Sequence, residues 1–162
     1  AWPEECPIPS LEQLFTTCPE FEHYQLEVKS GSAGQSRIVL DAVTELVTRY
    51  GLQEKVVLTS SSRTLLKTAR DSSFGLPTGL VEEYGLIDWI KSCKRYGCDY
   101  LILNWKLCST QRVASAKAHG LHVSVWTVNE PALMQRLVEM GVDSIITDFP
   151  QLAVETLAKA PA

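Results

Sequence analysis

Short runs rich in β-branched and aromatic residues alternate along the chain with longer amphipathic segments. From the second run onward, neighbouring centres lie about 22 residues apart, which leaves room for a strand, a helix and two short loops. The runs have the length and composition of buried strands. They cover residues 23–29, 55–60, 77–81, 100–105, 122–127 and 144–147.

The segments between these runs have helical periodicity and recognisable ends. Ser10 followed by Gln13 predicts a capping box at the start of a first helix. An apolar stripe over residues 39–50 predicts a second helix, which Gly51 ends. Further helices are predicted over 86–96, over 110–119, from the turn holding Pro131 to Gly141, and from about Pro150. The predicted order is therefore one helix followed by six βα units.

Alternating strands and helices predict a parallel sheet with right-handed crossovers. Six strands suit either an open doubly wound sheet or most of an eight-stranded barrel. Within residues 24–29, Leu26 and Val28 point to one face, while Gln25, Glu27 and Lys29 point to the other. A central strand of an open sheet is apolar on both faces, whereas a barrel strand can place polar groups near the catalytic mouth. The pattern favours a parallel (βα)₈ TIM-type barrel that is incomplete, with its last six βα units present.

Composition narrows the class of protein. Hydrophobic residues make up 45% of the chain and charged residues 21%, which is typical of a globular protein. No linker rich in Pro, Gly or Ser divides residues 1–162, so a single domain is expected. The net charge of −4 and the lack of a Lys/Arg cluster argue against nucleic-acid binding. No apolar run approaches the length of a membrane span. Five irregularly spaced cysteines predict free thiols in a reducing compartment, hence a cytoplasmic location.

Glu27 and Lys29 are the strongest local chemical signal. Two residues apart on a strand, a carboxylate and an ammonium share one face at a spacing of about 7 Å. The carboxylate can hold a hard divalent cation, and the ammonium can neutralise a phosphate oxygen. The alternative is a solvated Glu/Lys face on an edge strand, and the spacing alone favours that alternative.

Other polar positions have simpler structural interpretations. The loop over residues 30–34 is similar to a dinucleotide fingerprint but lacks the third glycine, so a nucleotide-binding domain is a weak third reading. Hydroxyls over residues 59–62 can contact phosphate, although Ser62 is better placed as a helix cap. Asn129 and Asp148 are each expected to cap the helix that follows. Trp126 is either core or pocket wall. His23, His119 and His122 avoid the carboxyl ends of strands and are expected to be structural or solvated.

Four segments together resemble the glycerophosphodiester phosphodiesterase family. Ile8-Pro-Ser-Leu-Glu12 is similar to that family's Ile-Pro-Thr-Leu-Glu, and Leu26-Glu-Val-Lys29 to its Ile-Glu-Ile-Lys strand. Val125-Trp-Thr-Val-Asn129 resembles its Trp-Thr-Val-Asn strand end. Residues 141–150 resemble its closing Gly-(Val/Ile)-Asp-Gly-Ile-Ile-Thr-Asp-Tyr-Pro. The likeness runs from about Ile8 to Leu157, and the last two motifs in this order are its most specific part.

The resemblance implies a barrel that binds a divalent cation, Mg²⁺ or Ca²⁺, and hydrolyses glycerophosphodiesters to an alcohol and glycerol 3-phosphate. By position, Glu27 corresponds to a metal ligand, Lys29 to the catalytic lysine that faces the substrate phosphate, and Trp126 to a residue of the substrate pocket. Such an enzyme serves lipid and glycerol metabolism and takes a small-molecule partner.

The sequence also departs from the family. The family's His-Arg-Gly, Pro-Glu-Asn-Thr, Glu-x-Asp and His-Asp motifs do not occur here, and they carry the acid/base histidines and the other acidic ligands. Two of the eight barrel strands are missing with them. We therefore expect the chain to be the C-terminal part of a longer enzyme and to be inactive alone. The rival is a non-catalytic phosphate-binding or assembly module of the same fold, which would close the gap in its barrel by forming a homo-oligomer or rearranging its sheet.

Overall fold

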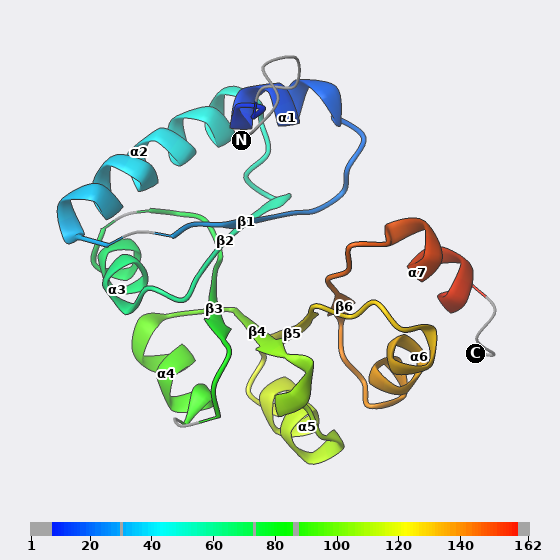
Figure 1. Ribbon diagram of the computed structural model, residues 1–162. Helices are drawn as coiled ribbons and strands as arrows, with labels where there is room; N and C mark the ends of the chain where they lie inside the picture. Colours follow the sequence, from blue (N-terminus) through cyan, green and yellow to red (C-terminus); the bar gives the residue numbers. More distant parts are fainter. Residues whose placement is uncertain (1–7, 30, 73, 86–87, 159–162) are drawn as a thin grey trace.

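Six parallel strands form one curled sheet in strictly sequential order, with the helices on its outer, convex side (Figure 1). The computed structural model describes residues 8–29, 31–72, 74–85 and 88–158. The strands are β1 (Tyr24–Glu27), β2 (Val56–Ser60), β3 (Thr78–Glu82), β4 (Tyr100–Asn104), β5 (His122–Trp126) and β6 (Ser144–Ile145). The helices are α1 (Leu11–Thr17), α2 (Ala33–Arg49), α3 (Arg63–Asp71), α4 (Trp89–Tyr96), α5 (Thr110–Ala118), α6 (Pro131–Glu139) and α7 (Pro150–Leu157), with a 3₁₀ turn at Trp105–Leu107. The predicted order of one helix and six βα units is confirmed.

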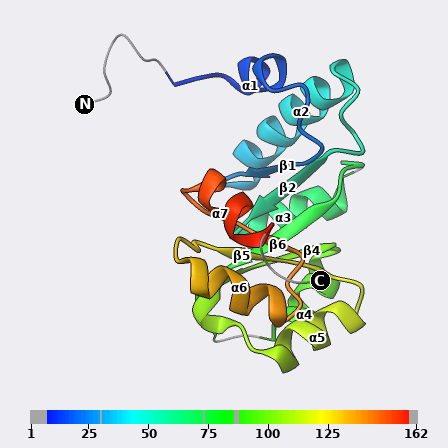
Figure 2. The same cartoon turned by 90° about the vertical axis from the view of Figure 1, so that its right-hand side faces the viewer.

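The sequential order β1-β2-β3-β4-β5-β6 separates the two architectures that the sequence left open. A doubly wound sheet reverses its strand order at a switch point, and this sheet does not. Among the described residues β1 pairs only with β2, and β6 pairs only with β5. The sheet is thus a half-barrel with two free edges. Figure 2 shows α6 and α7 on the β6 side of this half-barrel.

The two faces of the sheet differ in chemistry, as the alternation in β1 predicts. Leu26 and Val28 pack against the hydrophobic core, which lies between the sheet and the helices. That core contains the fully buried side chains Leu58, Leu80, Leu101, Leu103, Val123 and Val125, each from a strand residue facing outward. Val57 and Ile102 are also buried but stand outside this cluster. They belong to the concave face, together with the polar residues described below.

Side-chain caps position several helices, and two sequence predictions about caps are wrong. The capping box of Ser10 and Gln13 is present, and Ser62 accepts a hydrogen bond from the backbone of Leu65. The residue expected to cap α6 was Asn129, yet the cap position is Glu130 and makes no side-chain bond. Likewise α7 is preceded by Phe149 rather than by the expected Asp148. Both helices begin with proline, which removes one of the amide donors that a cap would satisfy.

The loop expected over residues 30–34 is shorter than predicted. Ser32 caps α2 through a second capping box with Gln35, and Ala33 and Gly34 already belong to the helix. Residues 32–34 of the segment compared with a dinucleotide loop therefore belong to the helix cap and the first turn of α2. Residue 30 lies outside the described residues.

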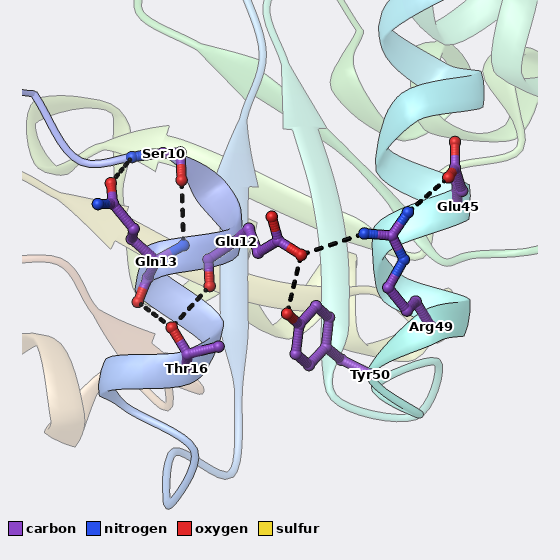
Figure 3. A network of polar contacts seen from close by, with 7 residues as sticks. All are labelled: Ser10, Glu12, Gln13, Thr16, Glu45, Arg49 and Tyr50. Atoms are coloured by element: carbon purple, nitrogen blue, oxygen red, sulfur yellow. Dashed lines mark hydrogen bonds and ion pairs between the residues drawn. The ribbon is translucent and has the colours of Figure 1, made fainter.

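A polar network ties α1 to the end of α2 (Figure 3). One carboxylate oxygen of Glu12 accepts hydrogen bonds from Arg49 Nη1 at 3.1 Å and from Tyr50 Oη at 2.9 Å. Arg49 also bonds Glu45 one turn earlier in α2 at 2.7 Å. Glu12, which carries part of the family resemblance, therefore has a structural role in holding the first helix against the second.

Four cysteines lie in the described part of the chain, and all four are free thiols, as predicted. Cys93 and Cys98 are buried, whereas Cys18 and Cys108 are partly buried. Burial raises the pKa of the Cys108 thiol to about 11. Cys6 lies outside the described residues. None of the described helices has the length and apolar character needed to cross a lipid bilayer.

Candidate functional site

The concave face ends in a pocket of about 440 Å³ at the carboxyl ends of the strands. Its wall includes Glu27 and Lys29 from the end of β1 and Trp126 from the end of β5. The three residues that the sequence singled out are therefore brought to one cavity. The remaining lining residues come from the same strand ends, namely Gln25, Thr59, Ser61, Val81, Glu83, Ile102, Thr127 and Ile146. A larger groove of about 580 Å³ lies between α2 and α3, away from the concave face.

Glu27 and Lys29 form an exposed ion pair at the mouth of this pocket. Lys29 Nζ lies 3.7 Å from Glu27 Oε1, with side chains 81% and 45% exposed. An exposed pair of this kind contributes little to folding, typically about 0–1 kcal/mol. The two charges are therefore not needed to hold the fold and remain accessible to a solute. Their parts as metal ligand and phosphate-binding group stay predictions.

The hydroxyl residues at the end of β2 divide between two tasks. Thr59 and Ser61 line the pocket, and their contact with a ligand stays a prediction. Ser60, which faces the other way, donates a hydrogen bond to the carbonyl of Val28. Ser62 caps α3, as predicted. Because side chains alternate between the two faces of the strand, every second hydroxyl residue faces the pocket.

Below the mouth, a line of hydrogen bonds crosses the concave face from β1 to β6. Gln25 Nε2 donates to Ser124 Oγ at 2.9 Å, linking residues 99 positions apart in the chain. Ser124 Oγ lies 2.6 Å from Ser144 Oγ, which lies 3.0 Å from His122 Nε2. We call Gln25, Ser124, Ser144 and His122 the polar relay. Gln25 is the relay residue that lines the pocket, and we call its part of the wall the pocket floor.

The histidines lie on the amino-terminal side of the sheet, as the sequence predicted, and two of them are stacked there. The rings of His23 and His122 stack with centroids 6.4 Å apart, and the ring of Tyr100 contacts both, at 4.4 Å from His122 and 5.8 Å from His23. Burial lowers the pKa of His122; Lys117 and His23 also lower it, while Asp143 opposes the shift. The neutral ring is favoured at neutral pH. His119 bonds the backbone of Ser115 within its own helix, so none of the three reaches the pocket wall.

Two buried polar atoms of the pocket wall lack a partner. Gln25 Oε1 and Trp126 Nε1 are both inaccessible to solvent, and neither has a hydrogen-bond partner in the described part of the chain. One is an acceptor and the other a donor. Sequence reasoning placed Trp126 correctly at the strand end but left its role open, and it treated Gln25 only as one of several inward polar residues.

A buried ion pair supports the outer side of the same strand ends. Glu82, at the end of β3, is 6% exposed and pairs with Arg63 of α3. Burial raises the pKa of Glu82 above its ordinary value, although the Arg63 guanidinium opposes the shift. Sequence reasoning missed this pair because its members lie 19 residues apart in different elements. An acidic residue at an outward-facing position of an apolar strand was the available signal.

Asn129 and Asp148 meet beyond the carboxyl ends of β5 and β6, in another role than the one predicted. Asn129 Nδ2 donates to Asp148 Oδ2 at 2.8 Å, while Asn129 Oδ1 accepts from Thr147 Oγ1 at 3.0 Å and from the Asp148 backbone at 3.1 Å. The amide therefore clamps the segment after β6 to the segment after β5. The two family motifs at the end of the chain, which contain these residues, are linked by this clamp.

The described residues do not form a complete cation site. Glu27 and Glu83 both line the pocket, but no group of three or more His, Cys, Asp or Glu side chains suited to a metal ion is present in the described ranges. A hard cation usually takes six or more oxygen ligands, of which some are water. Two exposed carboxylates are only a partial donor set for such an ion.

Comparison with known proteins places this half-barrel in a family. Residues 3–152 match the model of the glycerophosphoryl diester phosphodiesterase family, so the chain belongs to that family. It is 26% identical over 156 residues to a glycerophosphodiester phosphodiesterase of Caldanaerobacter subterraneus, covering 94% of this chain and 63% of the relative.

Solved structures agree in fold. A putative glycerophosphoryl diester phosphodiesterase from Silicibacter pomeroyi superposes with a TM-score of 0.83 at 26% identity, covering 93% of this chain and 56% of that one. A phosphodiesterase from Oleispira antarctica, solved with the product sn-glycerol-3-phosphate, gives a TM-score of 0.82 at 20% identity, covering 93% and 62%. The chain thus spans less than two thirds of the length of these relatives. The family resemblance deduced from sequence is confirmed.

Proposed function

We propose that this chain is the phosphate-binding part of a glycerophosphodiester phosphodiesterase, which hydrolyses glycerophosphodiesters to an alcohol and glycerol 3-phosphate. The observation that carries the proposal is the single pocket lined by Glu27, Lys29 and Trp126 at the strand ends. Family membership supports the substrate class, as does the product bound by the Oleispira antarctica relative.

In this proposal different pocket residues contact different parts of the substrate. The Lys29 ammonium neutralises a phosphate oxygen, which is the electrostatic assistance that phosphoryl transfer requires. The Glu27 carboxylate supplies one oxygen ligand to Mg²⁺ or Ca²⁺. Trp126 forms a wall beside the alcohol of the ester. When bound, the cation would polarise phosphoryl oxygens and orient the attacking water.

The proposal treats residues 1–162 as the C-terminal part of a (βα)₈ barrel, acting in the cytoplasm. The free edges of β1 and β6 are where two further strands would pair, and the shorter span of the chain relative to its relatives agrees with this. The absent family motifs carry the acid/base histidines and the remaining acidic ligands. Each proton-transfer group contributes typically about 10²–10⁴-fold to rate, so the chain alone is expected to have little or no activity.

A second candidate is a non-catalytic phosphate-binding or assembly module. The partial donor set among the described residues favours it, because an ammonium can hold a phosphate without a metal. Such a module would keep the binding function of Lys29 while lacking turnover. A homo-oligomer that covers the open edges would accompany it.

The test combines turnover with binding. Purified 162-residue chain is incubated with glycerophosphocholine and Mg²⁺ or Ca²⁺, and binding of glycerol 3-phosphate is measured by calorimetry. We expect binding that Lys29→Met weakens, with no turnover; Lys106→Met, a change to an exposed lysine outside the pocket wall, is the control. Turnover by the chain would refute the expected inactivity. Absence of binding, or equal binding by the Lys29 variant, would overturn the phosphate pocket.

If the native protein extends upstream with a His-Arg-Gly segment, the two candidates separate. The hydrolase then turns over glycerophosphocholine, with a dependence on metal that Glu27→Gln abolishes. An extended native protein that binds glycerol 3-phosphate without any turnover is the module.

A further inference from the structure

The pocket floor contains an amide whose two ends have different environments. Gln25 is fixed by its Nε2 group, which donates to the fully buried Ser124. The other end, Oε1, is buried without a partner among the described residues, and Gln25 belongs to the pocket wall. A buried acceptor without a partner costs free energy, so native proteins rarely keep one unless a ligand or an ordered water meets it.

The hydrogen bond to Ser124 determines which end of the Gln25 amide is left without a partner. Gln25 Nε2 can only donate, so Ser124 Oγ accepts from it. Ser124 Oγ also shares a hydrogen bond with Ser144 Oγ, which bonds His122 Nε2, and the donor in each of these two bonds depends on the tautomer of the neutral ring. The lowered pKa of His122 agrees with that neutral state. With Nε2 held by Ser124, the carbonyl oxygen Oε1 is the end of the Gln25 amide that has no partner among the described residues.

The other partnerless atom of the wall complements this acceptor. Trp126 Nε1 carries a donor that is buried at the same cavity. A ligand that satisfies both atoms must accept one hydrogen bond and donate another. A phosphate dianion only accepts, whereas an alcohol hydroxyl does both.

Resting on the proposed function, we propose that Gln25 is a specificity-determining residue for the alcohol part of the phosphoester. Gln25 Oε1 accepts a hydrogen bond from a hydroxyl group, and Trp126 Nε1 donates to a hydroxyl oxygen in the same pocket. Ser124 is a positioning residue, which acts by holding the amide. Lys29 at the mouth binds the phosphate, so the phosphate end and the hydroxyl end of a polyol phosphate are bound by different residues.

The experiment compares two phosphomonoesters with the same carbon chain. Sn-glycerol 3-phosphate carries two hydroxyls, and propyl phosphate carries none. Titrations of the 162-residue chain are followed by ¹H–¹⁵N spectra of the tryptophan indoles, with the Trp126 signal assigned by its loss in Trp126→Phe. We expect tighter binding of sn-glycerol 3-phosphate, and a Trp126 indole shift with that ester that propyl phosphate does not produce.

Variants separate recognition of the hydroxyls from recognition of the phosphate. Gln25→Met keeps the size but removes the acceptor, and should reduce the affinity ratio of the two esters about five- to tenfold, the effect of one hydrogen bond. Ser124→Ala should reduce the ratio by less. Lys29→Met should weaken both esters by the same factor, and Gln135→Met on the exposed surface of α6 should change neither.

The outcomes distinguish the two proposals. If the wild-type chain binds both esters equally, or if Gln25→Met folds and keeps the wild-type ratio, the role of Gln25 is overturned while the phosphate pocket stands. Should neither ester bind, the proposed function fails and this inference fails with it. A Gln25→Met variant that does not fold is replaced by Gln25→Glu. That carboxylate keeps the acceptor but repels phosphate, so both affinities fall and the hydroxyl-dependent shift of Trp126 persists; loss of the shift contradicts the proposal.

Discussion

Gly79, the second residue of β3, occupies a point on the concave face where no side chain fits. A Cβ built there would lie 2.6 Å from Ile102 Cδ1, 2.9 Å from Tyr100 Cβ and 3.1 Å from Thr59 Cγ2. The end of the Ile102 side chain can rotate away. The Cβ of Tyr100 is fixed to the backbone of the neighbouring strand β4, so the clash with it can be relieved only by moving the sheet.

The expected cost of Gly79→Ala follows from these contacts. Overpacking a core by a methyl group typically costs about 1–3 kcal/mol. Replacing glycine also stabilises the fold by about 0.4–1 kcal/mol through the unfolded chain, because Gly79 does not have a positive φ that alanine would resist. We therefore expect a net loss of about 1–2 kcal/mol in the free energy of unfolding. Urea unfolding followed by circular dichroism should show a lower midpoint at an unchanged m-value.

Gly34→Ala is the matched control. Gly34 lies in the first turn of α2, and a Cβ there has nothing within 4 Å. The same substitution should stabilise the chain by up to about 0.5–1 kcal/mol, because only the helix preference and the unfolded state change. The packing argument is refuted if Gly79→Ala is as stable as the wild type, or if both variants shift in the same direction.

Two further predictions concern buried charge. Arg63→Met leaves the Glu82 carboxylate buried without its partner, so we expect the free energy of unfolding to fall by about 3 kcal/mol. The double variant Arg63→Met/Glu82→Gln should recover much of this loss. Urea unfolding of the wild type, both single variants and the double variant measures the coupling, and additive effects would contradict it. Because the pKa of His122 is lowered by burial, the unfolded chain binds more protons just below pH 6.5, and stability should fall as the pH drops from about 6.5. Urea midpoints at pH 7.5 and 5.5 should show this fall, and His122→Gln should reduce it; equal falls in both proteins would exclude the histidine.

Local rules predicted the elements of this chain but not the contacts between them. Strand alternation placed Glu27 and Lys29 on the concave face, and glycine and capping signals located the helix ends. The Asn129 and Asp148 predictions failed because a cap rule considers only the next turn. It cannot anticipate that pairing of β5 with β6 brings two residues 19 positions apart to one clamp.

The pocket floor shows the same limit more strongly. Gln25 and Ser124 lie 99 positions apart, and only the curl of the sheet brings them together. Nothing in the neighbourhood of Gln25 in the sequence distinguishes it from a solvated polar residue. Strand alternation predicted that Gln25 faces the opposite side of the sheet from Leu26. The sequence did not indicate that Gln25 bonds Ser124 or that its Oε1 lacks a partner among the described residues.

The uniform direction of the βα units has an electrostatic consequence. Every helix from α2 to α7 follows its strand, so its amino-terminal end lies on the side where the strands end and the pocket opens. Helix macrodipoles place about half a positive charge at each such end. A chain with a net charge of −4 therefore presents a ring of partial positive charge around the mouth. Such partial charges attract anions in general, and salt limits their reach to about 8–10 Å.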